Sequence, residues 1–258
     1  MKILITGANG YVGKSLYNAL KNEYDVTGLT RNDFDLTAFQ SMNDFFQGKY
    51  FDIVIHCAVV GGNRLKQDSS YDMDVNLVSY YNLLQHKPYF NKFIHFGSGA
   101  ELYSKDTPYG LSKHVIRESI LGQDNFYNLR IFAVFDENEL DTRFIKANIK
   151  NYINKQPLQV FKDKKMDFFY MPDLITLVKY YLNNSGLPKE IDCSYNNTNT
   201  LLNISQIINN LADYRIPIIF NHQTDDKPYI GKFTDLNLNY IGLEQGIINV
   251  YNKIKNEY

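Results

Sequence analysis

The chain has 258 residues, enough for one large α/β domain or for a nucleotide-binding domain with a smaller lobe. Its 27 Lys and Arg against 28 Asp and Glu exclude a general attraction for nucleic acid or an anionic membrane surface. No apolar stretch reaches the roughly 18 residues of a membrane span, and no leader segment opens the chain. The two cysteines, Cys57 and Cys193, match neither a disulfide framework nor a metal site. We therefore expect a cytoplasmic protein with no metal, nucleic-acid or membrane partner.

Short apolar runs alternate along the chain with stretches whose apolar residues recur at spacings of three and four. Strands are expected at 2–5, 25–30, 52–56, 92–96, 127–132 and 167–171. Helices are expected between them at 12–22, 37–47, 70–86, 108–121 and 173–183. Because parallel neighbours need a crossover connection, this alternation predicts a doubly wound parallel sheet with helices on both faces.

After residue 136 the alternation becomes irregular. A helix is expected over 141–155, a strand over 158–162, a helix over 203–214 and a last short helix over 246–256. We expect two domains: 1–136 with about 164–193 as the doubly wound part, and about 137–163 with 194–258 as a small, discontinuous C-terminal lobe.

The first expected strand runs into ITGANGYVG, which places Gly7, Gly10 and Gly13 at intervals of three. A strand-to-helix turn gathers free backbone N–H groups and the positive end of a helix, and glycine lets the backbone approach a pyrophosphate closely. The alternative is a glycine-rich turn without a ligand, and the position behind the first strand favours the nucleotide. The Gly-x-x-Gly-x-x-Gly spacing resembles that of the extended short-chain dehydrogenases/reductases, a family of nucleotide-sugar epimerases, dehydratases and keto-reductases.

This family carries a Tyr-x-x-x-Lys pair on a helix, with a Ser or Thr shortly before it. YGLSK supplies Tyr109 and Lys113, four residues apart and on the same side of the expected helix, and Ser98 follows the strand KFIHF. A chance pair on a solvated helix face is the alternative, and the combination with the glycines favours a catalytic site. The resemblance implies that Tyr109 exchanges a proton, that Lys113 favours the phenolate and holds the nicotinamide ribose, and that Ser98 orients the reacting oxygen.

The resemblance also implies a Rossmann-like fold for the large domain, substrate binding by the small lobe, and contacts spread along the chain. The expected cofactor contacts are Gly7, Asn9, Gly10, Tyr11, Val12, Gly13, Arg31, Asp35, Leu36, Ala58, Val59, Tyr109, Lys113 and Phe132. The expected substrate contacts are Gly61, Ser98, Gly99 and Tyr109. Asn76 has two open interpretations, a site residue or an amide that packs one helix against another. Ala133 and Asp136 depart from the Asn and Gly usual in the family, which leaves that wall of the substrate site unassigned.

The second expected strand ends in Thr30-Arg31, at the place where an Asp or Glu would take the ribose hydroxyls of NAD. An arginine instead makes a forked, charge-assisted contact with a 2′-phosphate. We therefore expect NADP, with NAD as the alternative cofactor and a solvated loop arginine as the alternative interpretation of Arg31.

Dehydratases of the family need an Asp-Glu pair directly after the catalytic Thr. Gly99 and Ala100 stand there and Glu101 comes one residue late, which argues against dehydration. The sequence thus predicts an NAD(P)-dependent oxidoreductase that reduces a 4-keto nucleotide-linked sugar in surface-polysaccharide synthesis. A nucleotide-sugar 4-epimerase with retained NAD and a non-catalytic dinucleotide-binding regulator are the alternatives. A homodimer through helices 70–86 and 108–121 is expected, since relatives commonly pair in this way.

Overall fold

The computed structural model describes residues 1–62, 66–220 and 227–256. The chain divides into two compact units, Met1–Arg130 with Lys179–Ile191, and Ile131–Val178 with Asp192–Tyr258. Within the described residues, no helix is both long and apolar enough to cross a membrane. Within the same residues, no group of three or more His, Cys, Asp or Glu side chains is placed to hold a metal ion.

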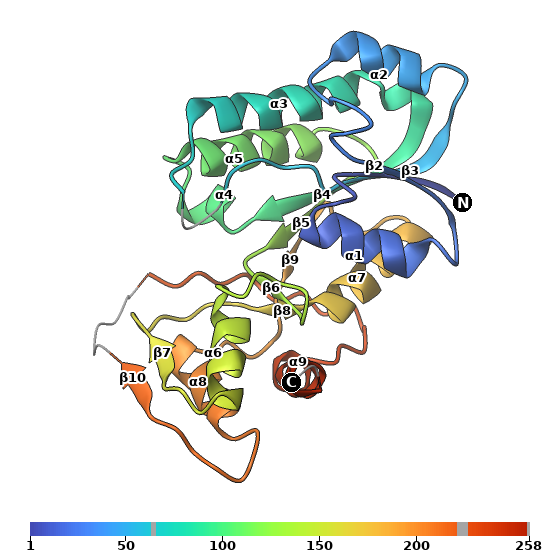
Figure 1. Cartoon of the computed structure of the whole chain (residues 1–258). Helices are drawn as coiled ribbons and strands as arrows, with labels where there is room; N and C mark the ends of the chain where they lie inside the picture. The colour runs from blue at the N-terminus through green and yellow to red at the C-terminus, as the bar shows by residue number, and fades with distance from the viewer. Residues whose placement is uncertain (63–65, 221–226, 257–258) are drawn as a thin grey trace. The chain divides into compact units, whose positions relative to one another are not determined.

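A six-stranded sheet in the order β2-β1-β3-β4-β5-β9 forms the centre of the first unit (Figure 1). Its strands are β2 (Asp25–Leu29), β1 (Lys2–Thr6), β3 (Phe51–His56), β4 (Phe90–Ser98), β5 (Phe126–Ile131) and β9 (Glu190–Cys193). The β1–β2, β1–β3 and β3–β4 pairs are all parallel. The chain leaves β1 for β2 on one side and returns to β3 on the other. The carboxyl ends of β1 and β3 are therefore a topological switch point, where open α/β sheets bind ligands.

Helices cover both faces of this sheet, with α1 on one face and α2, α3 and α5 on the other (Figure 1). The helices of this unit are α1 (Tyr11–Leu20), α2 (Phe39–Phe46), α3 (Ser70–Gln85), the short α4 (Ala100–Tyr103), α5 (Pro108–Leu121) and a 3₁₀ turn, η1 (Lys87–Tyr89). A capping box of Ser69 with Asp72 starts α3, and Thr107 caps α5 by accepting from the backbone N–H of Gly110. These caps fix where the two helices that flank the candidate site begin.

The apolar residues that alternate along the expected helices form the core under α2, α3 and α5. Leu4 and Val54 of the central strands are fully buried there with Phe46 of α2 and Tyr80 of α3. Phe93 of β4 packs on a β5 phenylalanine with ring centroids 4.8 Å apart. Burial of each such side chain is worth about 1.5–3 kcal/mol, so this layer holds the sheet and the helices as one body.

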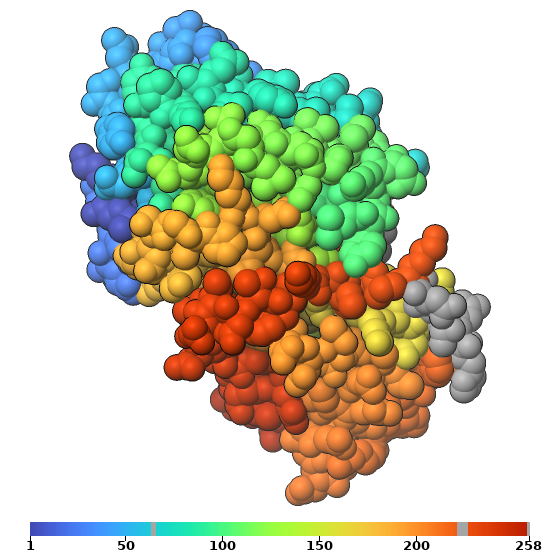
Figure 2. Space-filling model, turned by 180° about the vertical axis from the view of Figure 1, so that it is seen from behind, coloured from blue at the N-terminus to red at the C-terminus, as the bar shows by residue number. Residues whose placement is uncertain are grey.

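The second unit has its own core between α6, α8 and α9. Its elements are β6 (Val134–Phe135), α6 (Phe144–Ile153), β7 (Leu158–Val160), β8 (Phe169–Tyr170), most of α7 (Met171–Asn183), α8 (Leu201–Asn209), β10 (Ile218–Phe220) and α9 (Leu243–Lys255). Ile149, Tyr152, Ile204 and Ile247 are fully buried in this core. Two small parallel pairs complete the unit, β6 with β8 and β7 with β10, and the second pair brings yellow and orange segments together in Figure 2.

The expected α/β architecture is confirmed, but one strand of the large sheet differs. The expected strand 167–171 is reduced to β8, which pairs with β6 outside the large sheet. The sixth position is taken by β9, whose four residues Glu-Ile-Asp-Cys alternate between half-buried and buried. A strand this short, with two acids, carries no recognisable apolar run, which is why the sequence did not reveal it.

Gly110 in α5 tests the close packing of this helix on α4. A Cβ at Gly110 would lie 1.9 Å from the carbonyl oxygen of Ser104, so Gly110→Ala should lower the free energy of unfolding by about 3 kcal/mol. Gly122→Ala is the matched control, because a Cβ there would meet the Ser119 carbonyl oxygen at an ordinary 3.6 Å, and it should change stability by less than about 0.5 kcal/mol. Urea unfolding of both variants measures the difference, and equal losses would contradict the packing described here.

Candidate active site

The turn between β1 and α1 is built from glycines at points where a side chain does not fit. Gly7 has a φ of +67°, and a Cβ there would lie 2.7 Å from the Cα of Ala58 at the end of β3. A Cβ on Gly13 would lie 2.3 Å from the carbonyl oxygen of Gly7. Among the described residues no side chain caps α1 at Gly10, and the first turn of α1 holds no acid. The turn therefore offers backbone N–H groups and the positive end of α1 to an anion.

A cavity of about 770 Å³ lies beside this turn, and its lining comes entirely from the first unit. The expected cofactor contacts that line it are Gly7, Asn9, Gly10, Tyr11, Val12, Gly13, Arg31, Asp35, Leu36, Ala58 and Val59. Asn76, one of whose two open interpretations is a site residue, also lines the cavity. The lining residues that were not expected as contacts are Leu29, Thr30, Asn32, Phe34, Thr37, Cys57, Val60, Tyr71, Val75 and Ser79. Most of these lie in the loop after β2 or on one side of α3, where only the strand order shows that they meet. The volume is within the roughly 300–1,000 Å³ of small-ligand sites, so the residues present fit a dinucleotide.

The cavity lining after β2 includes the exposed Arg31, and the acid Asp33 lies two residues further along the chain. The Asp33 carboxylate accepts hydrogen bonds from the backbone N–H of Thr30 at 3.0 Å and from its hydroxyl at 2.6 Å. These bonds hold the pKa of Asp33 below its usual value. Asp33 therefore closes a local turn, and Asp35, which lines the cavity with Arg31, closes a second one by accepting from the backbone N–H and the hydroxyl of Thr37 at 2.8 Å each.

Tyr109 and Lys113 lie one turn apart on α5, as their spacing predicts. The Lys113 ammonium is 5.9 Å from the centre of the Tyr109 ring and donates to the backbone carbonyl of Phe96 on β4 at 2.6 Å. Burial lowers the pKa of Lys113 to about 8. The Tyr109 ring lies against the loop after β3, where a Cβ on Gly62 would be 2.8 Å from Cζ of the ring. The structure thus brings Tyr109 next to the Gly61-Gly62 segment expected to border the substrate.

Ser98 is the last residue of β4 and is almost fully buried. Its hydroxyl oxygen accepts a hydrogen bond from the backbone N–H of Ala100 at 3.2 Å. Gly99 directly precedes α4 and is the N-cap of that short helix. Because Lys113 is bonded to Phe96, two residues before Ser98, the end of β4 joins the Ser98 and Lys113 positions.

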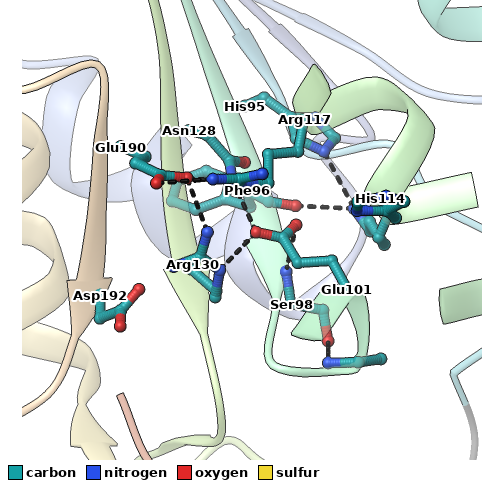
Figure 3. A network of polar contacts seen from close by, with 12 residues as sticks. His95, Phe96, Ser98, Glu101, His114, Arg117, Asn128, Arg130, Glu190 and Asp192 are labelled. Carbon is teal, nitrogen blue, oxygen red and sulfur yellow. Dashed lines mark hydrogen bonds and ion pairs between the residues drawn. The ribbon is translucent and has the colours of Figure 1, made fainter. Parts of the chain in front are cut away.

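Glu101 is the centre of a buried polar network that the sequence did not reveal (Figure 3). Its carboxylate is fully buried, pairs with the Arg130 guanidinium, and accepts from the Asn128 amide at 2.9 Å and from the backbone N–H of Ser98 at 3.4 Å. Glycine at position 97 is needed for this, since a Cβ on Gly97 would lie 2.7 Å from Oε2 of Glu101. Burial raises the pKa of Glu101, and the charge of Arg130 opposes that shift. The Glu101 carboxylate is therefore fully engaged by Arg130, Asn128 and the Ser98 amide, in the interior of the first unit.

The network continues from Arg130 to the edge of the sheet. Arg130 also binds the Glu190 carboxylate of β9 at 2.7 Å, and Glu190 accepts two further bonds from Arg117 of α5 at 2.6 and 2.7 Å. These bonds hold the pKa of Glu190 below its usual value. The helix that carries Tyr109 and Lys113 is therefore tied by ion pairs to Glu190 of β9 and, through Glu190, to Arg130 of β5.

Asn76 acts as a packing amide in this structure. Its side chain accepts from the backbone N–H of Val60 at 2.8 Å, donates to the Val60 carbonyl at 2.9 Å, and donates to the Ser112 hydroxyl of α5 at 3.3 Å. It also lines the cavity, so it joins the loop after β3 to the two helices beside the site. Of its two open interpretations, the hydrogen bonds favour the structural one.

Phe132 belongs to the second unit and is not among the cavity residues that the structure describes. Its ring meets that of Tyr229 edge-on at 5.5 Å, and a Cβ on Gly231 would lie 2.5 Å from it. Asp167 and Asp192 hold this segment by accepting from the backbone N–H groups of Gly231 and Lys232 at 2.8 and 2.7 Å. The contact of Phe132 with a nicotinamide stays a prediction.

The glycine turn, the cavity and the Tyr109–Lys113 pair together match one known family. The sequence profile of the NAD dependent epimerase/dehydratase family matches residues 3–196. The chain belongs to this family. The match covers the glycine turn, Ser98, Tyr109 and Lys113, and it confirms the family resemblance inferred from their spacing.

Two named proteins are similar to this chain in sequence. The spore coat polysaccharide biosynthesis protein SpsK of Bacillus subtilis (strain 168) is 26% identical over 213 residues, which cover 72% of this chain and 74% of the relative. The GDP-L-colitose synthase of Yersinia pseudotuberculosis is 24% identical over 265 residues, covering 86% of this chain and 85% of the synthase.

Solved structures of family members confirm the doubly wound fold. MlghC, a GDP-mannoheptose C4 reductase of Campylobacter jejuni solved with NADP bound, has a TM-score of 0.83 at 16% identity and matches over 98% of both chains. A UDP-glucose 4-epimerase of Thermotoga maritima, solved with UDP-glucose, also has a TM-score of 0.83 at 16% identity, over 100% of this chain and 99% of the epimerase. At these identities the likeness shows the fold alone.

Replacing Arg130 tests the buried network. Arg130→Met leaves the Glu101 carboxylate buried beside an apolar side chain, and the free energy of unfolding should fall by about 3–5 kcal/mol at neutral or higher pH. The folded-state pKa of Glu101 is raised above its unfolded value, so the deficit should shrink as the pH falls and the carboxyl takes up a proton. Urea unfolding at pH about 8 and about 5 measures both effects.

The control for this prediction is Lys179→Met. Lys179 pairs with Glu23 on the surface of the same unit, and loss of that pair should cost no more than about 1 kcal/mol. A loss for Arg130→Met as small as that of the control, or one that grows at low pH, would contradict the assigned network.

Proposed function

We propose that this chain is an NADP-preferring oxidoreductase that reduces a 4-keto nucleotide-linked sugar in surface-polysaccharide synthesis. The observation that carries the proposal is the Lys113 ammonium, buried beside Tyr109 and anchored to the β4 carbonyl that precedes Ser98. Burying a lysine ammonium costs folding free energy. Its positive charge favours the phenolate form of a neighbouring tyrosine, which gives the buried lysine a role in proton transfer.

The residues that would hold the cofactor are those of the cavity. The backbone N–H groups of the glycine turn and the start of α1 suit its pyrophosphate, and Ala58 and Val59 at the end of β3 would lie along it. Arg31 suits a 2′-phosphate, and the Oδ2 atom of the nearby Asp33 carboxylate is already bonded to the Thr30 N–H and hydroxyl. When bound, the reduced cofactor supplies a hydride to the sugar carbon.

The protein's own residues would then handle the proton. Tyr109 donates its hydroxyl proton to the keto oxygen as the hydride reaches C4, and the resulting phenolate is stabilised by the positive charge of Lys113. Ser98 would hold the keto oxygen in place by a hydrogen bond, and Tyr109 regains its proton from solvent. The product is the 4-hydroxy sugar, and each turnover consumes one reduced cofactor.

Reduction is favoured over elimination by the contacts of Glu101, the acid that follows Ser98 in the sequence. Dehydration needs a carboxylic acid that reaches the leaving hydroxyl, and the Glu101 carboxylate points into the protein, where it binds Arg130, Asn128 and the Ser98 amide. Gly99 and Ala100 carry no ionisable group. Two similar proteins support this choice of reaction. SpsK is a spore coat polysaccharide biosynthesis protein, and MlghC is a C4 reductase solved with NADP bound.

A 4-epimerase with retained NAD is the second candidate, because the Thermotoga maritima UDP-glucose 4-epimerase shares the fold at an equal TM-score. A regulator that binds a dinucleotide without turnover is disfavoured by the intact Ser98, Tyr109 and Lys113. We further propose the expected homodimer through α3 and α5, since these helices expose Tyr71, Val78, Tyr81 and Leu111.

Tyr109→Phe tests the reaction together with its proton donor. The wild-type protein should oxidise NADPH with at least one member of a panel of nucleotide-linked 4-keto sugars, and Tyr109→Phe should lower kcat about 10²–10⁴-fold with little change in NADPH affinity. Tyr50→Phe, at an exposed tyrosine of the same unit, is the control and should behave as wild type. The readout is the loss of NADPH absorbance.

The same assay separates the candidates. An epimerase would interconvert two sugars without net NADPH oxidation, and a regulator would bind the cofactor and turn over no member of the panel. Near-normal activity of Tyr109→Phe would overturn the assignment of Tyr109.

Arg31→Gln tests the choice of cofactor. Loss of a forked, charged contact with the 2′-phosphate should weaken NADPH binding about 10- to 100-fold and leave NADH binding unchanged. Lys21→Gln, which removes an exposed cation that contacts Asn18 near the other end of α1, should change neither affinity. Fluorescence titration measures the dissociation constants, and a wild-type preference for NADH or an equal loss for both cofactors would refute the role of Arg31.

A further inference from the structure

Lys113 has a second partner on β4 besides the Phe96 carbonyl. Its ammonium nitrogen lies 3.4 Å from Nε2 of His95, a neighbour of Phe96 that is 1% exposed. Two of the three ammonium hydrogens can therefore be directed at β4, one at the Phe96 carbonyl and one at the imidazole. The third hydrogen remains for another acceptor, and the Tyr109 ring centre is 5.9 Å from the ammonium.

The imidazole of His95 packs against aromatic rings and one cation, Lys113. On β3, His56 stacks on it with ring centroids 5.5 Å apart and is itself bonded to the Thr6 hydroxyl at 2.8 Å, and the Cys57 thiol follows. On α3, the Tyr80 ring meets it edge-on at 6.4 Å. Lys113 is the cation that faces it from α5, and the ion-paired Glu101 of α4 acts on Lys113 through its charge. All of these residues belong to the first unit.

The proton positions follow from the partner. An ammonium only donates, so Nε2 of His95 must accept and Nδ1 must carry the ring proton. Nδ1 is buried, and it has no hydrogen-bond partner among the residues that the structure describes. An unpaired buried donor costs about 1–3 kcal/mol, which an apolar side chain like that of Phe93 would avoid. Stability alone therefore does not explain a histidine at this position, whereas an acceptor for Lys113 does.

We propose that His95 is a positioning residue that holds the Lys113 ammonium in its charged form and directs it at Tyr109 and the cofactor ribose. The proposal rests on the proposed function, in which the Lys113 charge supports proton transfer by Tyr109. His95 lies on β4, is not one of Ser98, Tyr109 and Lys113, and would act through Lys113.

The consequence has a definite sign. Burial lowers the pKa of Lys113 to about 8, so the useful charge is lost as the pH rises through that value. His95 stays neutral, because burial and the Lys113 charge keep its pKa well below its usual value, and its Nε2 can accept throughout that range. Without this acceptor the charged form of Lys113 is less favoured, and the alkaline limb of the activity profile should move to lower pH.

Two substitutions separate positioning from packing. His95→Leu fills the space without an acceptor, and the alkaline limb of kcat/KM for NADPH oxidation should move down by about one pH unit. His95→Gln places an amide oxygen near the original Nε2 and should restore the wild-type limb. His86→Leu is the control, because His86 is an equally buried histidine bonded to Asn82 and Asn43, and its loss should lower stability without moving the limb.

A second measurement needs no substrate. The chain has five histidines, so ¹⁵N-labelled histidine spectra are simple, and the His95 signals are those lost in His95→Gln. They should show an unprotonated Nε2 that responds to pH near 8 as Lys113 titrates, and this response should vanish in Lys113→Met.

The outcomes are separable. A protonated Nε2, or an alkaline limb of His95→Leu that coincides with wild type, overturns the proposal. If the wild-type protein turns over no nucleotide sugar, the proposed function fails, and the His95 spectra still decide whether Nε2 accepts from Lys113.

Discussion

The fold and the site both depend on a close approach of two backbones at the carboxyl ends of β1 and β3. Gly7 lies so near Ala58, and Gly13 so near Gly7, that no side chain fits between them. This contact places the first turn of α1 beside the end of β3, at the switch point of the sheet. The cavity is lined by residues on both sides of this contact, the glycine turn after β1 and Cys57 to Val60 after β3.

The end of β4 has a different character, because it is fixed by buried charge. Glu101 holds the Ser98 amide, Arg130 neutralises Glu101, and Lys113 is anchored to Phe96. Buried ion pairs of this kind contribute little net stability. They fix geometry, because removing one partner leaves the other as an unpaired buried charge. Ser98 therefore lies on a strand end fixed by buried polar contacts, and the Glu101 carboxylate near it is bonded to Arg130, Asn128 and the Ser98 amide.

Most of the first unit could be predicted from the sequence, because its strands and helices have strong periods and its glycines have a physical reason. Ser98, Tyr109 and Lys113 were found in the same way, from residue types at fixed spacings, and their roles remain proposals. The sequence did not reveal β9, whose four residues are too short and too acidic for a period, or the partnership of Glu101 with Arg130. That partnership joins residues 29 positions apart, and His95 meets Lys113 across 18. Such pairs become visible only when the strand order is known.

The cluster of Gly97, Glu101, Asn128 and Arg130 also limits how relatives of this chain can diverge. The glycine leaves room for the carboxylate, the amide and the guanidinium satisfy it, and each position makes sense only beside the other three. Substitutions there will not add independently, because they share partners. A single change at one of these four positions leaves the other three without the partner they were shaped for, so the four are expected to change together or not at all.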